Sequence, residues 1–138
     1  MPVVHASAVA VSNRAALIIG ASGSGKSSLA LQLIALGAQL VCDDRVTLHR
    51  AGDTLIAGPA PNIGGLVEAR GVGLLTAPIA APCPVVMVVD LDTREDQRLP
   101  HRRTDHFGID LPLFHKVENP AWPAALWLYL NGKRQSHE

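Results

Sequence analysis

The chain has 138 residues, 48% of them hydrophobic, and its 12 basic and 12 acidic side chains leave a formal net charge of zero. A chain of this length is expected to form one small domain, which excludes two full domains. The balanced charge argues against a protein that holds nucleic acid through phosphate contacts. No apolar run reaches the roughly 18 residues of a membrane span, and no signal-peptide pattern opens the chain. We therefore expect a cytoplasmic protein that does not bind a membrane.

The first half of the chain is expected to contain short strands around one helix. Five segments of alternating or continuous apolar residues predict strands: His5–Val11, Ala15–Ile19, Gln39–Cys42, Arg45–His49 and Thr54–Ala57. The first two should pair as a hairpin, and so should the last two. Apolar residues at helical spacing predict a helix from Lys26 to Leu36, with Gly37 as its C-cap.

The second half begins with a β-branched run, Val85 to Leu91, which is typical of a buried strand. The charged stretch that follows shows no periodicity, so residues 92–108 are expected to be a mobile surface loop. A strand over Ile109–Leu113 and a helix over Pro120–Leu130 should come next, and residues 133–138 should form a frayed tail. These elements predict an α/β fold with a mixed β-sheet.

One motif in the chain carries specific chemistry. Residues 20–27 match G-x-x-x-x-G-K-[ST], the P-loop, and lie between a predicted strand and a predicted helix, as a phosphate-binding loop must. The candidate nucleotide-binding residues are Gly20, Ala21, Ser22, Gly23, Ser24, Gly25, Lys26, Ser27 and Ser28. The glycines let backbone N–H groups surround phosphate oxygens, Lys26 neutralises their charge, and Ser27 can ligate Mg²⁺.

Acidic residues follow the next predicted strand. Asp43 and Asp44 come directly after Gln39–Cys42, where a crossover from the P-loop helix would return them to the phosphate site. One carboxylate could support magnesium while the other accepts a proton from an incoming hydroxyl. A solvated acidic turn is the alternative interpretation.

Five further positions are candidate site residues. Glu68 and Arg70 would share one face of an extended segment, as a metal-binding carboxylate beside a charge-stabilising guanidinium, although a surface ion pair fits the spacing equally well. Gly71 and Gly73 beside them suggest a close backbone approach. On residue type alone, His5 is expected to be a hydrogen-bonded core histidine.

Taken together, His5, the segment GASGSGKSSLALQLIALGAQLVCDDRV and the segment EARGVGLL resemble the catalytic domain of HPr kinase/phosphorylase. This family phosphorylates a serine of the phosphocarrier HPr with ATP, and its fold is similar to that of phosphoenolpyruvate carboxykinase. The resemblance implies a single kinase domain over residues 1–138 without the family's N-terminal domain, like the short α-proteobacterial forms. It also implies ATP and Mg²⁺ as cofactors, HPr or an HPr-like carrier as partner, and a homo-oligomer, since the family forms hexamers.

The same resemblance implies roles for single residues. Asp44 would take the proton of the substrate serine, Lys26 would clamp phosphate, and His5 would be an active-site histidine, contrary to its residue-type interpretation. Ser27 and Glu68 would bind the metal, beside Asp43, the candidate that the acidic pair itself suggested. Arg70, Gly71 and Gly73 would belong to the signature region, and Arg98 would be the active-site arginine. The segment His115–Pro120 replaces a basic loop tied to dephosphorylation, so kinase activity is a safer expectation than phosphorylase activity.

Two other functions are compatible with the motifs. A small-molecule P-loop kinase would need a lid, for which the arginines between Arg94 and Arg103 could serve. An ATP-sensing regulatory module would bind nucleotide and a partner without transferring phosphate.

Overall fold

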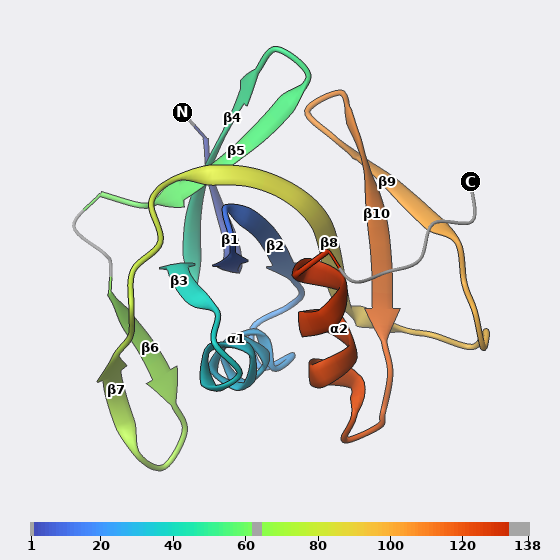
Figure 1. The fold of residues 1–138 in the computed structure, drawn as a ribbon. Helices are drawn as coiled ribbons and strands as arrows, with labels where there is room; N and C mark the ends of the chain where they lie inside the picture. The colour runs from blue at the N-terminus through green and yellow to red at the C-terminus, as the bar shows by residue number, and fades with distance from the viewer. Residues whose placement is uncertain (1, 62–64, 133–138) are drawn as a thin grey trace.

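The computed structural model describes residues 2–61 and 65–132 (Figure 1). Its strands are β1 (Val3–Val11), β2 (Arg14–Ile19), β3 (Gln39–Cys42), β4 (Arg45–Ala51), β5 (Thr54–Pro59), β6 (Leu66–Ala69), β7 (Gly73–Thr76), β8 (Cys83–Arg94), β9 (Arg102–His106) and β10 (Ile109–Lys116), and its helices are α1 (Lys26–Ala35) and α2 (Trp122–Leu130). The mixed α/β fold is confirmed. The predicted tail, residues 133–138, lies outside the described residues.

The larger sheet has eight strands in the order β2-β1-β4-β5-β8-β10-β9, with β3 also paired to β1. Because β2 pairs with β8 as well, the path from β2 to β8 closes on itself. The predicted hairpins β1–β2 and β4–β5 are both present and antiparallel, whereas β2 and β8 run parallel. The carboxyl ends of β2 and β8 therefore meet at one edge, from which the P-loop departs.

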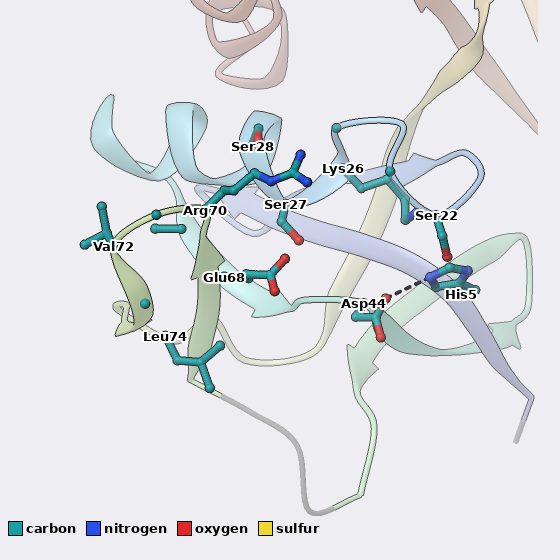
Figure 2. A pocket seen from close by; sticks show the side chains of 15 residues that line it. His5, Ser22, Lys26, Ser27, Ser28, Asp44, Glu68, Arg70, Val72 and Leu74 are labelled. Carbon is teal, nitrogen blue, oxygen red and sulfur yellow. Dashed lines mark hydrogen bonds and ion pairs between the residues drawn. The ribbon is translucent and has the colours of Figure 1, made fainter.

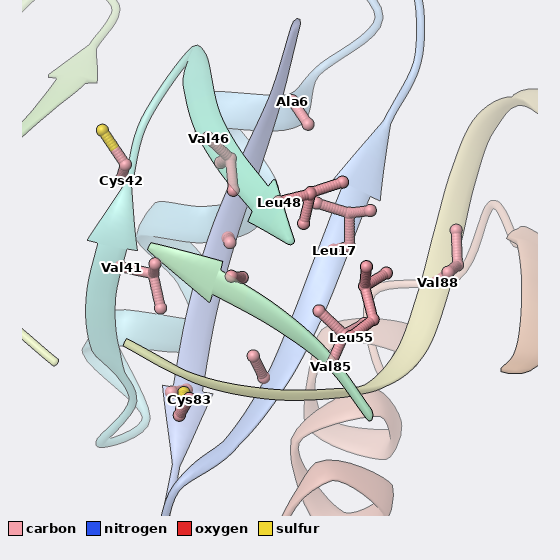
Figure 3. Close-up of a cluster of buried hydrophobic side chains, with 14 of the residues drawn as sticks. Ala6, Leu17, Val41, Cys42, Val46, Leu48, Leu55, Cys83, Val85 and Val88 are labelled. Carbon is pink, nitrogen blue, oxygen red and sulfur yellow. The ribbon is translucent and has the colours of Figure 1, made fainter. Parts of the chain in front are cut away.

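Side-chain alternation along the strands divides the core into two clusters. One cluster lies under the helices and contains Ile18 from β2, Leu33 from α1 and Met87 from β8. The other lies inside the curled sheet and contains Leu17 from β2 and Leu55 from β5 (Figure 3). Strand β2 thus supplies both layers and is buried on both faces, which fixes the point where the P-loop begins.

The helices follow the sequence patterns within one or two residues. Helix α1 ends one residue earlier than predicted, and Gly37 just beyond it has a positive φ of 121°. Helix α2 carries Pro123 in its first turn, where the missing N–H costs nothing. Within the described residues, no helix is long and apolar enough to cross a membrane.

The prediction of a mobile loop over residues 92–108 is wrong for much of this segment. Strand β8 continues to Arg94, and β9 pairs antiparallel with β10. Arg102 at the start of β9 donates hydrogen bonds to Glu95, whose side chain is only 4% exposed. The charged residues are therefore paired with one another, and ion pairing replaced the apolar alternation that a strand prediction requires.

The Arg102–Glu95 pair makes stability depend on pH in a defined direction. Hydrogen bonding from Arg102 lowers the pKa of Glu95 from 4.5 to about 2. A carboxyl with a depressed pKa stabilises the fold above its unfolded pKa, and this stabilisation is lost as the pH falls through the folded value. Glu95→Gln should therefore lower Tm in neutral buffer, and the difference from the wild type should shrink between pH 4.5 and about 2. Thermal unfolding by circular dichroism measures this, and a difference that widens in acid would contradict the account.

Candidate functional site

A pocket of about 720 Å³ lies at the N-terminus of α1 (Figure 2). It is bounded by the P-loop, by β1, by the turn after β3 and by the β6–β7 hairpin. The sequence-predicted site residues that line it are His5, Ser22, Gly23, Gly25, Lys26, Ser27, Ser28, Asp44, Glu68, Arg70, Gly71 and Gly73. Segments from the first 75 residues thus converge on one pocket that includes most of the predicted site.

The backbone of the P-loop needs its glycines. Gly23 and Gly25 have φ values of 82° and 106°, in the left-handed region that favours glycine. At Gly20, an added Cβ would lie 2.5 Å from Ser24 Oγ and 3.3 Å from Leu91 Cβ. Gly20, Ala21 and Ser24 do not line the pocket themselves, so their contribution is to the shape of the loop.

Lys26 folds back onto the loop. Its Nζ donates hydrogen bonds to the carbonyl oxygens of Gly20 at 2.9 Å and Ala21 at 3.1 Å, and the residue is 6% exposed. The ammonium group is therefore held at the pocket wall by two neutral acceptors. Because a phosphate oxygen is a charged acceptor, it can displace these carbonyls and form stronger hydrogen bonds with Lys26.

Asp43 connects three elements beneath the pocket. It is 7% exposed, accepts hydrogen bonds from Ser7 Oγ at 2.6 Å and from Ser27 Oγ at 2.9 Å, and accepts a third from the backbone N–H of Glu68 at 3.2 Å. One carboxylate thus fixes β1, α1 and β6 relative to each other. Ser7 was not singled out by the sequence, although it lies two positions from His5 on the same face of β1.

Asp44 turns toward solvent, unlike its neighbour. Its φ is 72°, and its carboxylate contacts His5, whereas that of Asp43 contacts Ser7 and Ser27. Its Oδ1 lies 2.7 Å from His5 Nε2, and the side chains of Asp44 and His5 are 65% and 48% exposed. The expectation that His5 is a core histidine is wrong. The arrangement gives an accessible carboxylate, oriented by a histidine, that can accept a proton.

The β6–β7 hairpin forms the opposite wall. Val67 and Ala69 are buried in the hairpin, whereas Glu68 and Arg70 line the pocket from β6 and from the turn that follows it. That turn returns the chain through Gly71, whose φ is 83°. Glu68 and Arg70 were expected to lie on one face of an extended segment. They do line the same pocket, although Arg70 lies just beyond the end of β6.

The donor atoms around Ser27 suit a hard cation. The Ser27 hydroxyl and the Asp43 and Glu68 carboxylates supply only oxygen, the ligand type that Mg²⁺ prefers. In the described part of the chain, no group of three or more His, Cys, Asp or Glu side chains could hold a metal by itself. This donor set fits Mg²⁺ that is bound together with substrate phosphates, which is how proteins commonly hold it.

Asp92 is a residue at this site that the sequence interpretation missed. Both of its carboxylate oxygens lie 3.0 Å from the backbone nitrogen of Ala21 and accept its N–H. Asp92 follows the buried part of β8, the parallel neighbour of β2. An acidic residue after a buried strand was the available signal, because the carboxyl ends of parallel strands meet at one edge.

Removing the Asp92 carboxylate should weaken phosphate binding by the loop. A hydrogen bond to a charged group contributes about 1.5–3 kcal/mol, and partial exposure reduces this, so Asp92→Ala should raise the KM for ATP about three- to tenfold with little change in kcat. Asp92→Asn keeps an oxygen acceptor and should lie between the two. Steady-state kinetics measures the split, and an unchanged KM in Asp92→Ala would refute this role.

Arg98 is not brought to the pocket. It is exposed in the connection between β8 and β9 and does not line the phosphate pocket. The expectation that it is the active-site arginine is therefore not met within the described residues. Arg70 is the arginine that lines the pocket.

Comparison with known proteins identifies the family. The model of the HPr serine kinase C-terminal domain matches residues 2–106. The HPr kinase/phosphorylase of Chlorobium phaeobacteroides (strain BS1) is 34% identical over 130 residues, which cover 84% of this chain and 38% of that protein. That of Peptoclostridium acidaminophilum is 36% identical over 115 residues, which cover 78% of this chain and 36% of that protein. The chain thus spans little more than a third of these relatives' length.

A solved structure shares the fold. The structure of the Hpr(Ser) kinase/phosphatase from Coxiella burnetii matches with a TM-score of 0.79 and 24% sequence identity, covering 96% of this chain and 95% of that one. Because it covers 96% of this chain, this similarity extends beyond residue 106, the end of the matched family model, into strand β10 and helix α2. On the sequence match and the shared fold together, the chain belongs to the HPr serine kinase C-terminal domain family.

Proposed function

We propose that the chain is an ATP-dependent protein kinase domain that transfers the terminal phosphoryl group to a serine hydroxyl of HPr or an HPr-like phosphocarrier. One observation carries the proposal: the phosphate-binding loop and the His5–Asp44 pair line the same pocket. Phosphate recognition and proton acceptance are the two functions that such a transfer requires of the protein. The names of the relatives supply the acceptor.

In the proposed reaction, the serine hydroxyl gives its proton to Asp44 as its oxygen bonds to the γ-phosphorus. The bond between the γ-phosphorus and the β–γ bridging oxygen breaks, and ADP leaves with the electron pair of that bond. Lys26 stabilises charge on the phosphate oxygens, and Arg70 faces the same charge from the hairpin. His5 orients the Asp44 carboxylate through the 2.7 Å contact.

Mg²⁺, held by Ser27 and Glu68 with Asp43 behind them, would supply charge neutralisation at the phosphates. Asp43 acts through its partners, because hydrogen bonds from Ser7 and Ser27 occupy its carboxylate. The contribution of this chain is thus a rigid arrangement in which one buried aspartate positions a hydroxyl and the neighbouring aspartate stays free for the proton.

An assay with Mg-ATP and purified HPr tests the proposal. ADP formation and phosphoserine on HPr should appear in equal amounts. ADP that forms without phosphorylated HPr would favour a small-molecule kinase, and ATP binding without ADP formation would favour a sensor. We also propose that the same residues catalyse the reverse removal of phosphate from HPr by phosphorolysis. Incubation of phosphorylated HPr with inorganic phosphate tests this activity.

A further inference from the structure

A cavity of about 430 Å³ lies away from the phosphate pocket, between the start of β2, the β9–β10 hairpin and the end of α2. Among the described residues, none lines both this cavity and the phosphate pocket. Strand β2 starts at the cavity with Arg14 and leads to the P-loop at its other end, and a six-residue strand spans about 17 Å. The cavity is therefore a separate space, and its volume lies in the range of about 300–1,000 Å³ that is typical of small-molecule sites.

The walls of this cavity combine basic groups with aromatic surface. Its basic lining residues are Arg14, His101, Arg102 and Arg103. In the part of the chain that the structure describes, no aspartate or glutamate lines it. The rings of Phe114 on β10 and Tyr129 on α2, which also line it, meet edge to face with their centroids 4.8 Å apart where α2 lies beside β10 (Figure 1). These walls suit an anion that carries a flat or apolar group.

Two of the three arginines are already paired with acids. Arg102 donates hydrogen bonds to Glu95 at 2.9 Å and to Asp96 at 3.2 Å. Arg103 donates one to Asp110 at 3.0 Å. Both guanidinium charges are therefore offset by carboxylates that lie outside the cavity wall. The charge of a bound anion must consequently be met elsewhere in the cavity.

Arg14 is the arginine whose charge is left over. This half-buried residue donates its Nε–H to the carbonyl oxygen of Leu130 at 2.8 Å, at the end of α2. Among the described residues, no acidic side chain pairs with it. A carbonyl at a helix C-terminus carries only a partial negative charge, so most of the guanidinium charge is unbalanced. Because Nε is occupied, Nη1 and Nη2 remain as the paired donors that bind a carboxylate or phosphate with two parallel hydrogen bonds.

We propose that this cavity binds a small organic oxyanion, a carboxylate or a phosphate ester, whose charged group pairs with Nη1 and Nη2 of Arg14 and whose ring or apolar part lies against Phe114 and Tyr129. A neutral molecule of the same shape would leave the charge of Arg14 unbalanced, and a bare inorganic ion would leave the aromatic wall uncovered. The inference goes beyond the proposed function, because it concerns a second ligand at the other end of β2 and holds whether or not the chain transfers phosphate.

The Nε–Hε signal of Arg14 in ¹⁵N NMR spectra reports on the site directly. Its hydrogen bond to Leu130 should slow its exchange with water and keep it visible. Benzoate and phenyl phosphate are the probes, and benzamide is the neutral analogue of benzoate. At least one of the two anions should shift the Arg14 signal, and comparison of the two identifies the preferred charged group. Benzamide should leave the signal in place.

Substitution of Arg14 tests the same assignment, with the backbone amide signals of Phe114 and Tyr129 as the readout of binding. Arg14→Gln removes the charge and the paired donors, so the dissociation constant of the bound probe should rise about tenfold or more. Arg14→Lys keeps the charge without the paired donors and should give an intermediate value. Arg98→Gln removes one charge at an exposed position outside the cavity and should bind the probe like the wild type.

Three results would overturn the proposal. The first is an Arg14 signal that neither anion moves, and the second is a signal that benzamide moves as far as benzoate does. The third is wild-type affinity for the probe in a folded Arg14→Gln protein. If circular dichroism shows that Arg14→Gln does not fold, the comparison of benzoate with benzamide on the wild type still decides the question, because it needs no substitution.

Discussion

Asp44→Asn should reduce phosphoryl transfer to HPr about 10²–10⁴-fold, the range typical of a lost general base. The amide has nearly the same shape as the carboxylate, but it cannot take the serine proton. Asparagine also tolerates the positive φ of 72° at this position, so the turn should survive the change. Affinity for ATP should stay within about twofold of the wild type, since Asp44 does not belong to the phosphate loop.

Single-turnover assays with HPr measure the transfer, and calorimetric titration measures ATP binding. Asp53→Asn is the matched control, because Asp53 is a fully exposed carboxylate in the turn between β4 and β5. It should leave both quantities unchanged. An Asp44→Asn protein that transfers phosphate at the wild-type rate would remove Asp44 from the role of base.

Lys26→Met should weaken ATP and tripolyphosphate binding together, by about 100-fold or about 2.7 kcal/mol. The lysine supplies the positive charge beside the phosphates, and methionine replaces its length but not its charge or its hydrogen bonds to Gly20 and Ala21. Both ligands depend on this charge equally, because both bind Lys26 through their phosphate groups.

Lys26→Arg provides an informative comparison. Arginine keeps the charge, but its planar guanidinium does not match a space that holds a compact ammonium between two carbonyls, so binding should remain impaired. Arg103→Met, at an exposed arginine on β9, controls for the loss of one positive charge. Calorimetric titration with ATP and with tripolyphosphate measures both affinities. A Lys26→Met protein that keeps wild-type affinity for tripolyphosphate would contradict a role of Lys26 in phosphate binding.

Local chemistry made much of this fold and site predictable from sequence. The P-loop pattern locates its own strand and helix, because the glycine backbone and the lysine only function between those elements. The crossover rule predicts that Asp43 and Asp44, at the end of β3, return to the phosphate-binding loop. Their different roles did not follow, since these depend on the positive φ of Asp44 and on hydrogen bonds that Asp43 receives from β1, α1 and β6.

Features that depend on contacts between distant segments could not be predicted from local sequence patterns. Strand β9 is held by its pairing to β10 and by the contact of Arg102 with Glu95, and neither leaves an apolar period in the sequence. His5 lies near the start of β1, just before the buried part of that strand, and residue type alone cannot reveal this exposure. Arg98 was assigned by resemblance, and the connection in which it lies is not part of the pocket.

The measurement that most directly tests the central claim is tandem mass spectrometry of HPr after incubation with Mg-ATP and either the wild-type protein or Asp44→Asn. The account predicts phosphate on a single serine of HPr with the wild type and, at equal early times, at least about a hundredfold less with the variant, although both bind ATP. Two results would contradict it: wild-type protein that binds ATP and leaves HPr unphosphorylated, or equal phosphoserine from the two proteins.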